Sequence, residues 1–155
     1  AYNYASGNWE RMKKFIHTAR VCGLSIAAAS FVLFEIFASG IVHVFLSTSG
    51  SNAADAAATI AFAAVFLRIR CAASIPQFLN YSTSFCMQAV GNGRGTLLHA
   101  SARELLFYIP FMFLFNALFG TTGLASALVL GESCGAVFAL LIQKNWNRKH
   151  LAQNV

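Results

Sequence analysis

Charged residues are scarce in this chain. Asp, Glu, Lys and Arg make up 10% of its 155 residues, whereas a soluble domain carries about 25% and uses them to cover its surface. Hydrophobic residues make up 57%, and 15 of them are phenylalanines. This balance excludes an ordinary soluble domain and predicts an integral membrane protein, with lipid as its solvent.

The motifs of common enzymes and cofactor sites are missing as well. The four cysteines form no CxxC pair and have no metal-ligand spacing, so we expect neither a disulfide framework nor a zinc site. The loop GNGRG at residues 91–95 lacks the lysine and the length of a phosphate-binding loop. No nucleophile stands in a pattern with a base. The sequence therefore predicts a protein that is not an enzyme and holds no metal.

Long uncharged runs take the place of those motifs. Ile36–Ala54, Cys71–Gly93 and Leu105–Gly131 contain 19, 23 and 27 residues without a charged side chain. A helix needs roughly 20 such residues to cross a bilayer. The chain is therefore predicted to be all-α, with four transmembrane helices.

Turn-rich segments between the apolar ones set the predicted boundaries. The helix over 53–90 is too long for one perpendicular span, so its start, 53–66, is expected to lie along or above the interface. Glycines in GNGRG and FGTTG favour helix ends. We predict a loop over 1–20, transmembrane helices over 21–46, 69–90, 96–118 and 123–143, and a tail over 144–155.

Basic residues lie on one side of this arrangement. The net charge is +6, and bases stand before the first span, after the second and after the fourth, whereas the loops STSGSN and FGTT have none. Lys and Arg favour cytoplasmic loops, so the charge indicates orientation and not nucleic-acid binding. Both ends are predicted to be cytoplasmic, in the inner (plasma) membrane. The first 20 residues are expected to be a loop cut from a longer protein.

Five short motifs stand in an order that resembles one family of transporters. They are YNYASGNWERMKK at residues 2–14, FLRI at 66–69, MQAVG at 87–91 after Pro76, YIP at 108–110 after Arg103, and FGTTG at 119–123. In these motifs the chain is similar to the multidrug and toxic compound extrusion (MATE) transporters. No motif is specific alone, but together they cover nearly the whole chain.

The resemblance implies a fold of twelve helices in two pseudo-symmetric lobes, of which this chain would supply the last four. It implies secondary active export of cationic or amphipathic drugs and toxins, coupled to Na+ or H+. Membrane lipid and the N-terminal lobe of the same full-length chain would be its partners. The aspartate that many members carry in the second of these helices is absent between Cys71 and Gly91, which argues against direct cation coordination from that helix.

Polar side chains form a stripe along the second span. Their spacings of 7, 4, 3 and 4 residues keep them on one helical face. Because an unpartnered amide in hydrocarbon costs several kcal/mol, the stripe must face protein or water. Hydrogen bonding between helices and a cavity wall that contacts substrate both remain open. The stripe consists of Arg70, Gln77, Tyr81, Ser84 and Gln88, with Asn80 beside it.

Two carboxylates lie inside predicted spans, where ionisable residues mark functional sites by default. Glu35 either forms a structural ion pair with Arg68 or Arg70, or takes part in transport. Glu132, midway along the fourth span, is either a cation or proton site or a buried hydrogen-bonded acid. Beside it, small residues at i+4 spacing predict close helix packing. These are Ala127, Gly131, Gly135 and Ala139.

The third span opens with two adjacent charges. Arg103 is expected to anchor this helix at the cytoplasmic face. Arg103 and Glu104 do not share a helical face, so their adjacency does not imply a direct pair. Further along, Pro110 predicts a kink, because it removes one backbone hydrogen bond.

Three other functions compete with a MATE-type antiporter. A self-contained four-helix exporter would act as an oligomer and have no further spans encoded upstream. A lipid flippase of related architecture would differ in moving a lipid in place of a drug. A non-transporting membrane scaffold needs no wet cavity, so the polar stripe disfavours it.

Overall fold

The computed structural model describes residues 1–46 and 53–151, and the regular structure in these two ranges is entirely helical. The prediction of an all-α protein is therefore confirmed. In chain order the elements are α1 (Tyr2–Ala5), α2 (Trp9–Leu46), α3 (Ala53–Ala72), α4 (Ser74–Ala89), α5 (Gly93–Ser101), the π-helix η1 (Ala102–Tyr108) and α6 (Ile109–Leu151).

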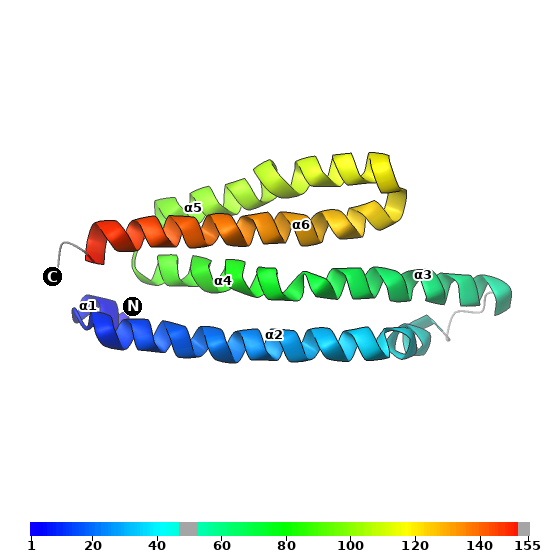
Figure 1. The fold of residues 1–155 in the computed structure, drawn as a ribbon, viewed down its shortest axis with the longest axis horizontal. Helices are drawn as coiled ribbons and strands as arrows, with labels where there is room; N and C mark the ends of the chain where they lie inside the picture. Colours follow the sequence, from blue (N-terminus) through cyan, green and yellow to red (C-terminus); the bar gives the residue numbers. More distant parts are fainter. Residues whose placement is uncertain (47–52, 152–155) are drawn as a thin grey trace.

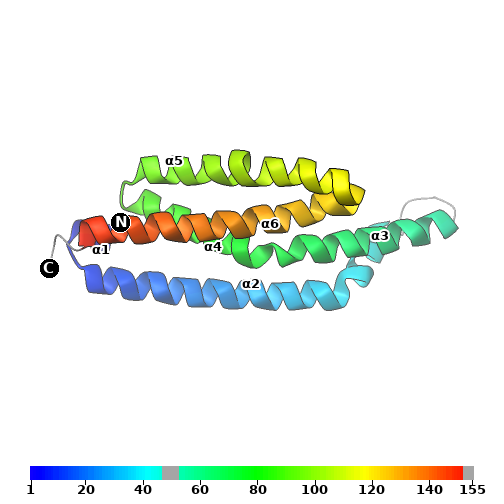
Figure 2. The ribbon, with the colours of Figure 1, turned by 45° about the horizontal axis from the view of Figure 1, so that its top comes forward.

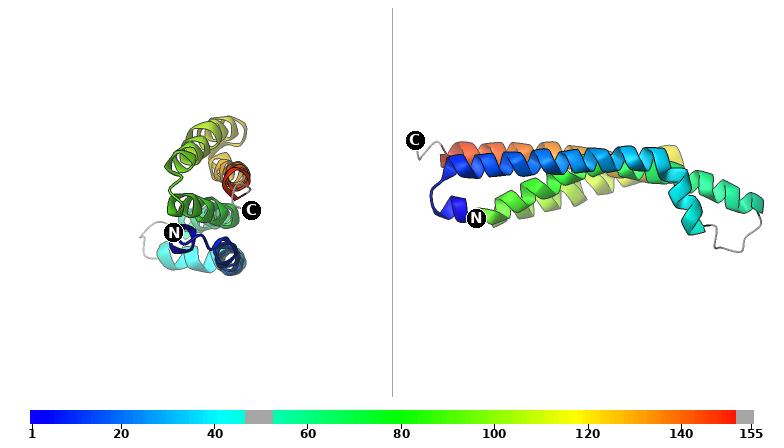
Figure 3. Two further views of the ribbon diagram at one scale, coloured as in Figure 1. Left: turned by 90° about the vertical axis from the view of Figure 1, so that its left-hand side faces the viewer. Right: turned by 90° about the horizontal axis from the view of Figure 1, so that it is seen from below.

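The elements form a bundle of long, roughly parallel or antiparallel rods (Figure 1). α2 is one rod, and α3 with α4 is the next. α5, η1 and the first part of α6 form a third, and α6 then reverses at Gly120 and returns beside it. The end-on view of Figure 3 shows the same rods packed side by side. At one end of the bundle, α1 lies beside the last turns of α6, where the Tyr4 and Trp146 rings are 5.9 Å apart (Figure 2).

Three helical stretches of the described chain are long and apolar enough to cross a membrane, by length and composition. They are Trp9–Leu46, Ala56–Ala89 and Gly93–Lys149, and the third contains the reversal at Gly120. Large apolar side chains cover the outside of these helices; Phe85 and Phe113, for example, are 62% and 67% exposed. Such a surface suits lipid and further helices, as expected of an integral membrane protein.

α2 begins at Trp9, where the sequence predicted a loop over residues 1–20. Gly7, with a φ of +69°, follows the short α1. The side-chain oxygen of Asn8 accepts a hydrogen bond from the Arg11 N–H at 3.1 Å, which satisfies one free donor at the start of the helix. Glu10 and Lys14 pair across the next turn at 3.1 Å. The charged segment is helical because it carries its own cap.

The single helix predicted over 53–90 is in fact two. Pro76 has no N–H to donate to the carbonyl four residues earlier, and the Ala73 N–H turns to the Arg70 carbonyl at 3.2 Å. The chain therefore breaks between the end of α3 at Ala72 and the start of α4 at Ser74.

A π-helix directly precedes Pro110, the residue expected to kink the third arm. In η1 the Ile109 N–H bonds five residues back, to the Glu104 carbonyl. Pro110 then stands in the first turn of α6, where a missing donor costs little. Because single-turn π segments within helices occur frequently at functional sites, the side chains that η1 presents are of particular interest.

Candidate functional site

Polar residues from four helical elements meet between α4 and the C-terminal hairpin of α5, η1 and α6. Three of them are almost wholly buried: Asn80 is 0% exposed, His99 1% and Glu132 6%. We call the set the buried network. Its members are Asn80 and Ser84 from α4, His99 from α5, Arg103 from η1 and Glu132 from α6.

The amide of Asn80 connects two parts of the buried network. Its nitrogen donates to Glu132 Oε2 at 2.6 Å and to the Glu132 backbone carbonyl at 2.9 Å. Its oxygen lies 3.0 Å from Nε2 of His99, so Nε2 must carry the hydrogen. In the neutral imidazole, Nδ1 then accepts from the Ser84 hydroxyl at 2.8 Å. The hydrogen bonds run in one direction, from Ser84 through His99 and Asn80 to the carboxylate of Glu132.

Arg103 supplies the positive charge next to this chain of hydrogen bonds. Its guanidinium lies 3.8 Å from Glu132 Oε2 and 2.6 Å from Glu104 Oε1. The same group sits over the Tyr81 ring, 5.2 Å from its centroid. Arg103 thus bridges a buried carboxylate and a half-exposed one.

Arg103 and Glu104 form a direct pair in the structure, although their adjacent positions did not imply one. A π-helix has more residues per turn than an α-helix, so consecutive side chains in η1 lie closer in angle. The long arginine side chain spans the rest of the distance. Arg103 also points into the bundle, where its side chain is only 16% exposed, and not solely toward the end of the helix as an anchor would.

The small residues of α6 make room for the buried network. All four members of the predicted ladder are buried. A Cβ atom at Gly135 would lie 2.9 Å from Cγ of Arg103 and 3.3 Å from the amide of Asn80, and one at Gly131 would lie 3.1 Å from the Cα of Tyr108. Larger residues at these two positions would push η1 and α4 away from α6, and the network could not close.

The polar stripe of α4 divides in the structure. Asn80 and Ser84 enter the buried network, whereas Gln88 and Tyr81 are exposed on this part of the protein. Gln77 is partly buried and lies 3.5 Å from the guanidinium of Arg70. The stripe therefore faces a neighbouring helix along one edge and open surface along the other.

Glu35 lies apart from the network, between α2 and α3. Nε of Arg68 is 3.6 Å from Glu35 Oε2 and donates to the Glu35 backbone carbonyl at 3.2 Å. This is one of the two ion pairs that the sequence offered for Glu35. Both side chains are about two-fifths exposed, at 42% and 41%. A transport role for Glu35 stays a prediction.

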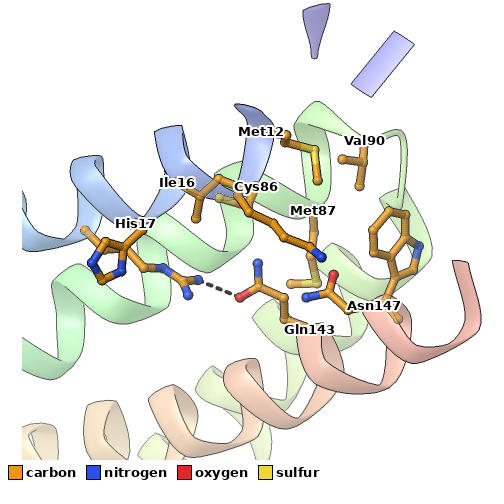
Figure 4. A pocket seen from close by; sticks show the side chains of 11 residues that line it. Met12, Ile16, His17, Cys86, Met87, Val90, Gln143 and Asn147 are labelled. Carbon is orange, nitrogen blue, oxygen red and sulfur yellow. Dashed lines mark hydrogen bonds between the residues drawn. The ribbon is translucent and has the colours of Figure 1, made fainter. Parts of the chain in front are cut away.

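A second polar group lies at the end of the bundle where α1 and the last turns of α6 meet. Arg20 donates through Nη2 to Thr83 Oγ1 at 2.9 Å and to Gln143 Oε1 at 2.6 Å, so it ties α2 to α4 and α6. It also lines a pocket of about 210 Å³ between these helices (Figure 4). We call this cavity the basic pocket, because Lys13, His17 and Arg20 of α2 all line it.

The sequence analysis did not identify His99 as a member of the buried network, and it did not identify the three basic residues that line the basic pocket. His99 and Arg103 stand at i and i+4 and so share a helical face, and this spacing is the signal by which their association could have been found. Lys13, His17 and Arg20 stand at i, i+4 and i+7 in the same way. The second pattern was missed because residues 1–20 were predicted to be a loop, and residues at this spacing share a face only in a helix.

The described residues offer little to a metal ion. Among them, no three His, Cys, Asp or Glu side chains gather in a way that would hold one. The groups that contact Glu132 are donors, namely the Asn80 amide nitrogen and the Arg103 guanidinium. The site is arranged to hold a carboxylate and to respond to its charge.

Comparison with curated proteins finds relatives named "Multidrug export protein MepA", a MATE family transporter. The protein of Staphylococcus saprophyticus is 28% identical over 142 residues, that of Staphylococcus aureus 30% over 142 and that of Staphylococcus haemolyticus 29% over 142. Each match covers 92% of this chain and 29% of the relative, so the chain spans less than a third of their length. No protein-family model and no solved structure matches the chain.

Proposed function

The chain is homologous to MATE-family multidrug exporters, and on this basis we propose that it is part of a proton-coupled antiporter for cationic or amphipathic compounds. Its relatives are transporters, which supports membrane transport of small molecules and not catalysis. In the proposed full-length protein, these helices form part of the C-terminal lobe and work against an N-terminal lobe, with both ends of this segment in the cytoplasm. Alternating access then arises as one lobe rocks against the other.

One observation carries the coupling part of the proposal. Glu132 is 6% exposed, lies within a stretch that is long and apolar enough to cross a membrane, and accepts a hydrogen bond from the amide of Asn80. A carboxylate in such a place is costly to keep charged and is a functional candidate by default. We assign Glu132 the role of the group that gains and loses the coupling proton.

The contacts of Glu132 favour a proton over a sodium ion. A hard cation such as Na+ needs several oxygen ligands, whereas the groups next to Glu132 are an N–H donor and a guanidinium. A second cation beside Arg103 would also meet like-charge repulsion. A proton requires neither new ligands nor the removal of Arg103.

Glu104 makes the charge change at Glu132 tolerable. When a buried ion pair loses one partner, the other is left with an uncompensated charge, which is strongly destabilising. Arg103 already pairs with Glu104 at 2.6 Å, closer than its 3.8 Å approach to Glu132. Protonation of Glu132 therefore leaves Arg103 paired.

Protonation would also change how the two arms of the C-terminal hairpin attract each other. Glu132 belongs to the returning arm of α6 and Arg103 to η1 on the other arm. Loss of the carboxylate charge weakens the electrostatic attraction between them and so favours states in which the arms shift. This differential interaction is what a coupling ion needs in order to bias alternating access.

The test is Glu132→Gln in the full-length transporter. Glutamine is nearly isosteric and can still accept the Asn80 hydrogen bond, so the fold should persist, but it cannot be protonated. We expect gradient-driven efflux of a fluorescent cationic dye to fall at least tenfold, to the level of cells without the transporter. Efflux by the parent should stop when a protonophore collapses the proton gradient and continue when sodium is absent.

Glu10→Gln is the matched control. It makes the same chemical change at an exposed acid whose side chain is 83% accessible and pairs only with Lys14 among the described residues. This variant should export at the parental rate. Parental efflux by Glu132→Gln from mildly acidic to mildly alkaline pH would make Glu132 a structural acid and refute the coupling role.

A further inference from the structure

The basic pocket has the features of an anion site. It opens at the end of the bundle and is lined from α2 by Lys13, His17 and Arg20, which share one helical face. α6 contributes the amide of Gln143, which holds Arg20, and that of Asn147 (Figure 4). None of the described residues that line the pocket carries a carboxylate. We propose that this pocket binds the phosphate group of an anionic phospholipid.

The basic residues of the pocket are not neutralised within the described part of the chain. The nearest acid along α2, Glu10, pairs with Lys14, which does not line the pocket. None of the ion pairs between described residues involves Lys13, His17 or Arg20. A phosphate would supply the counter-charge that Lys13 and Arg20 lack.

Hydrogen bonds to two neighbouring helices hold Arg20 in place beside the pocket. Its Nη2 is occupied by Thr83 and Gln143, which fixes the plane of the guanidinium. Its Nε is buried and has no hydrogen-bond partner among the described residues. A buried donor without a partner is destabilising, and a phosphate oxygen is an acceptor of the kind that this N–H lacks.

An apolar pocket beside the basic one indicates that the phosphate belongs to a lipid. This second cavity, of about 360 Å³, shares Met12, Ile16, Cys86 and Val90 with the basic pocket. Phe15 and Phe85 extend it along α2 and α4. A free phosphate would use only the charged cavity, whereas a phospholipid would place its headgroup there and the start of an acyl chain in the apolar one.

The position of the pocket in the bundle fits a lipid headgroup. It lies where the long apolar helices end, with Trp146 in its lining, and tryptophan is enriched at the membrane–water interface. Basic pockets between helices on the cytoplasmic side bind anionic headgroups in other membrane proteins. The proposal stands apart from proton coupling, because Glu132 and its partners take no part in the basic pocket.

The experiment is a lipid titration of the purified full-length protein in detergent. Phosphatidylglycerol is added and binding is followed by native mass spectrometry and by the rise in melting temperature. We expect saturable binding of phosphatidylglycerol, with no comparable effect of phosphatidylcholine. Lys13→Gln should weaken the apparent affinity about fivefold, in keeping with the contribution of one basic residue at an anionic surface.

Lys14→Gln is the control, because it removes the same charge one residue away and outside the pocket. Its affinity should stay within twofold of the parent. Equal losses in the two variants would mean diffuse surface attraction and overturn the proposal. Equal binding of phosphatidylcholine would also overturn it. Inorganic phosphate that displaces the lipid, or raises the melting temperature equally by itself, would identify a free-phosphate site and refute the lipid assignment.

Discussion

At the scale of single residues, the buried network depends on the chemistry of one amide. Asn80 donates to Glu132 through its nitrogen and accepts from His99 through its oxygen, so both ends of its side chain are in use. Aspartate has the same shape but no donor, and would place a second negative charge against Glu132. Leucine would fill the space but would remove one hydrogen bond from each of the two neighbours, Glu132 and His99. Asparagine meets the geometric and the electrostatic requirement together.

Asn80→Ala should therefore destabilise the protein more than the loss of one hydrogen bond. It leaves Glu132 and His99 both buried without this partner, at a cost of about 1–3 kcal/mol. Ser84→Ala removes only the hydroxyl next to Nδ1 of His99 and should cost about 0.6 kcal/mol, the average for a hydrogen bond between membrane helices. Reversible unfolding of the full-length protein in mixed micelles measures both. Equal, small effects would contradict the central position of Asn80.

At the scale of helical elements, the reversal in α6 is what brings η1 beside Glu132. Gly120 has a φ of 63° and a ψ of −142°, a conformation that is accessible almost only to glycine. After this reversal the returning arm packs its small residues against η1, with Gly131 facing Tyr108 and Gly135 facing Arg103. The position of the carboxylate follows from one backbone angle and from the small residues that come after it.

Gly120→Ala should be destabilising for a backbone reason alone. A Cβ atom at Gly120 would meet no atom within 4 Å, so the expected loss of about 1–3 kcal/mol comes from the strained φ and ψ of a residue with a side chain. Gly40→Ala is the matched control, since its Cβ would also meet nothing within 4 Å but Gly40 lies inside α2. That variant should gain about 0.5–1 kcal/mol. Melting temperatures that fall by the same amount in both would refute the assignment.

At the scale of the whole molecule, the structure separates two ends of the bundle. Met12, Val90 and Asn147 line one pocket, so the start of α2, the connection from α4 to α5 and the last turns of α6 lie together. The reversal at Gly120 lies at the opposite end (Figure 1). The basic residues predicted to be cytoplasmic are on segments at the first end. The loop STSGSN, which carries no base, lies outside the described residues.

We predict that the first end faces the cytoplasm, because Lys and Arg favour that side. In full-length protein without native cysteines, Arg94→Cys and Lys149→Cys should resist a membrane-impermeant thiol reagent applied to intact cells. Thr121→Cys, next to the reversal, should react. Permeabilised cells provide the control, in which all three must be labelled. Reaction at position 94 together with protection at position 121 would invert the topology.

Much of the protein could be predicted without its coordinates. Low charge and long apolar runs indicated an all-α membrane protein, and ordered motifs indicated the MATE relation that the comparisons with MepA support. Glu132 was recognisable because an acid inside an apolar span is costly wherever it points. Asn80 was recognisable for the same reason. These predictions rest on composition and on the free-energy cost of placing a polar group in lipid. Neither depends on how the chain folds.

The partners of those residues could be decided only by tertiary structure. Glu132 meets Asn80 and Arg103, which lie 52 and 29 positions away in sequence, because Gly120 reverses the chain and small residues allow close approach. The pairing of Arg103 with Glu104 required the π-helix η1, and the basic pocket required that residues 9–20 be helical. Hydrophobicity acts on each segment by itself and can be read from its sequence. A hydrogen bond or ion pair between distant helices exists only once their relative positions are set.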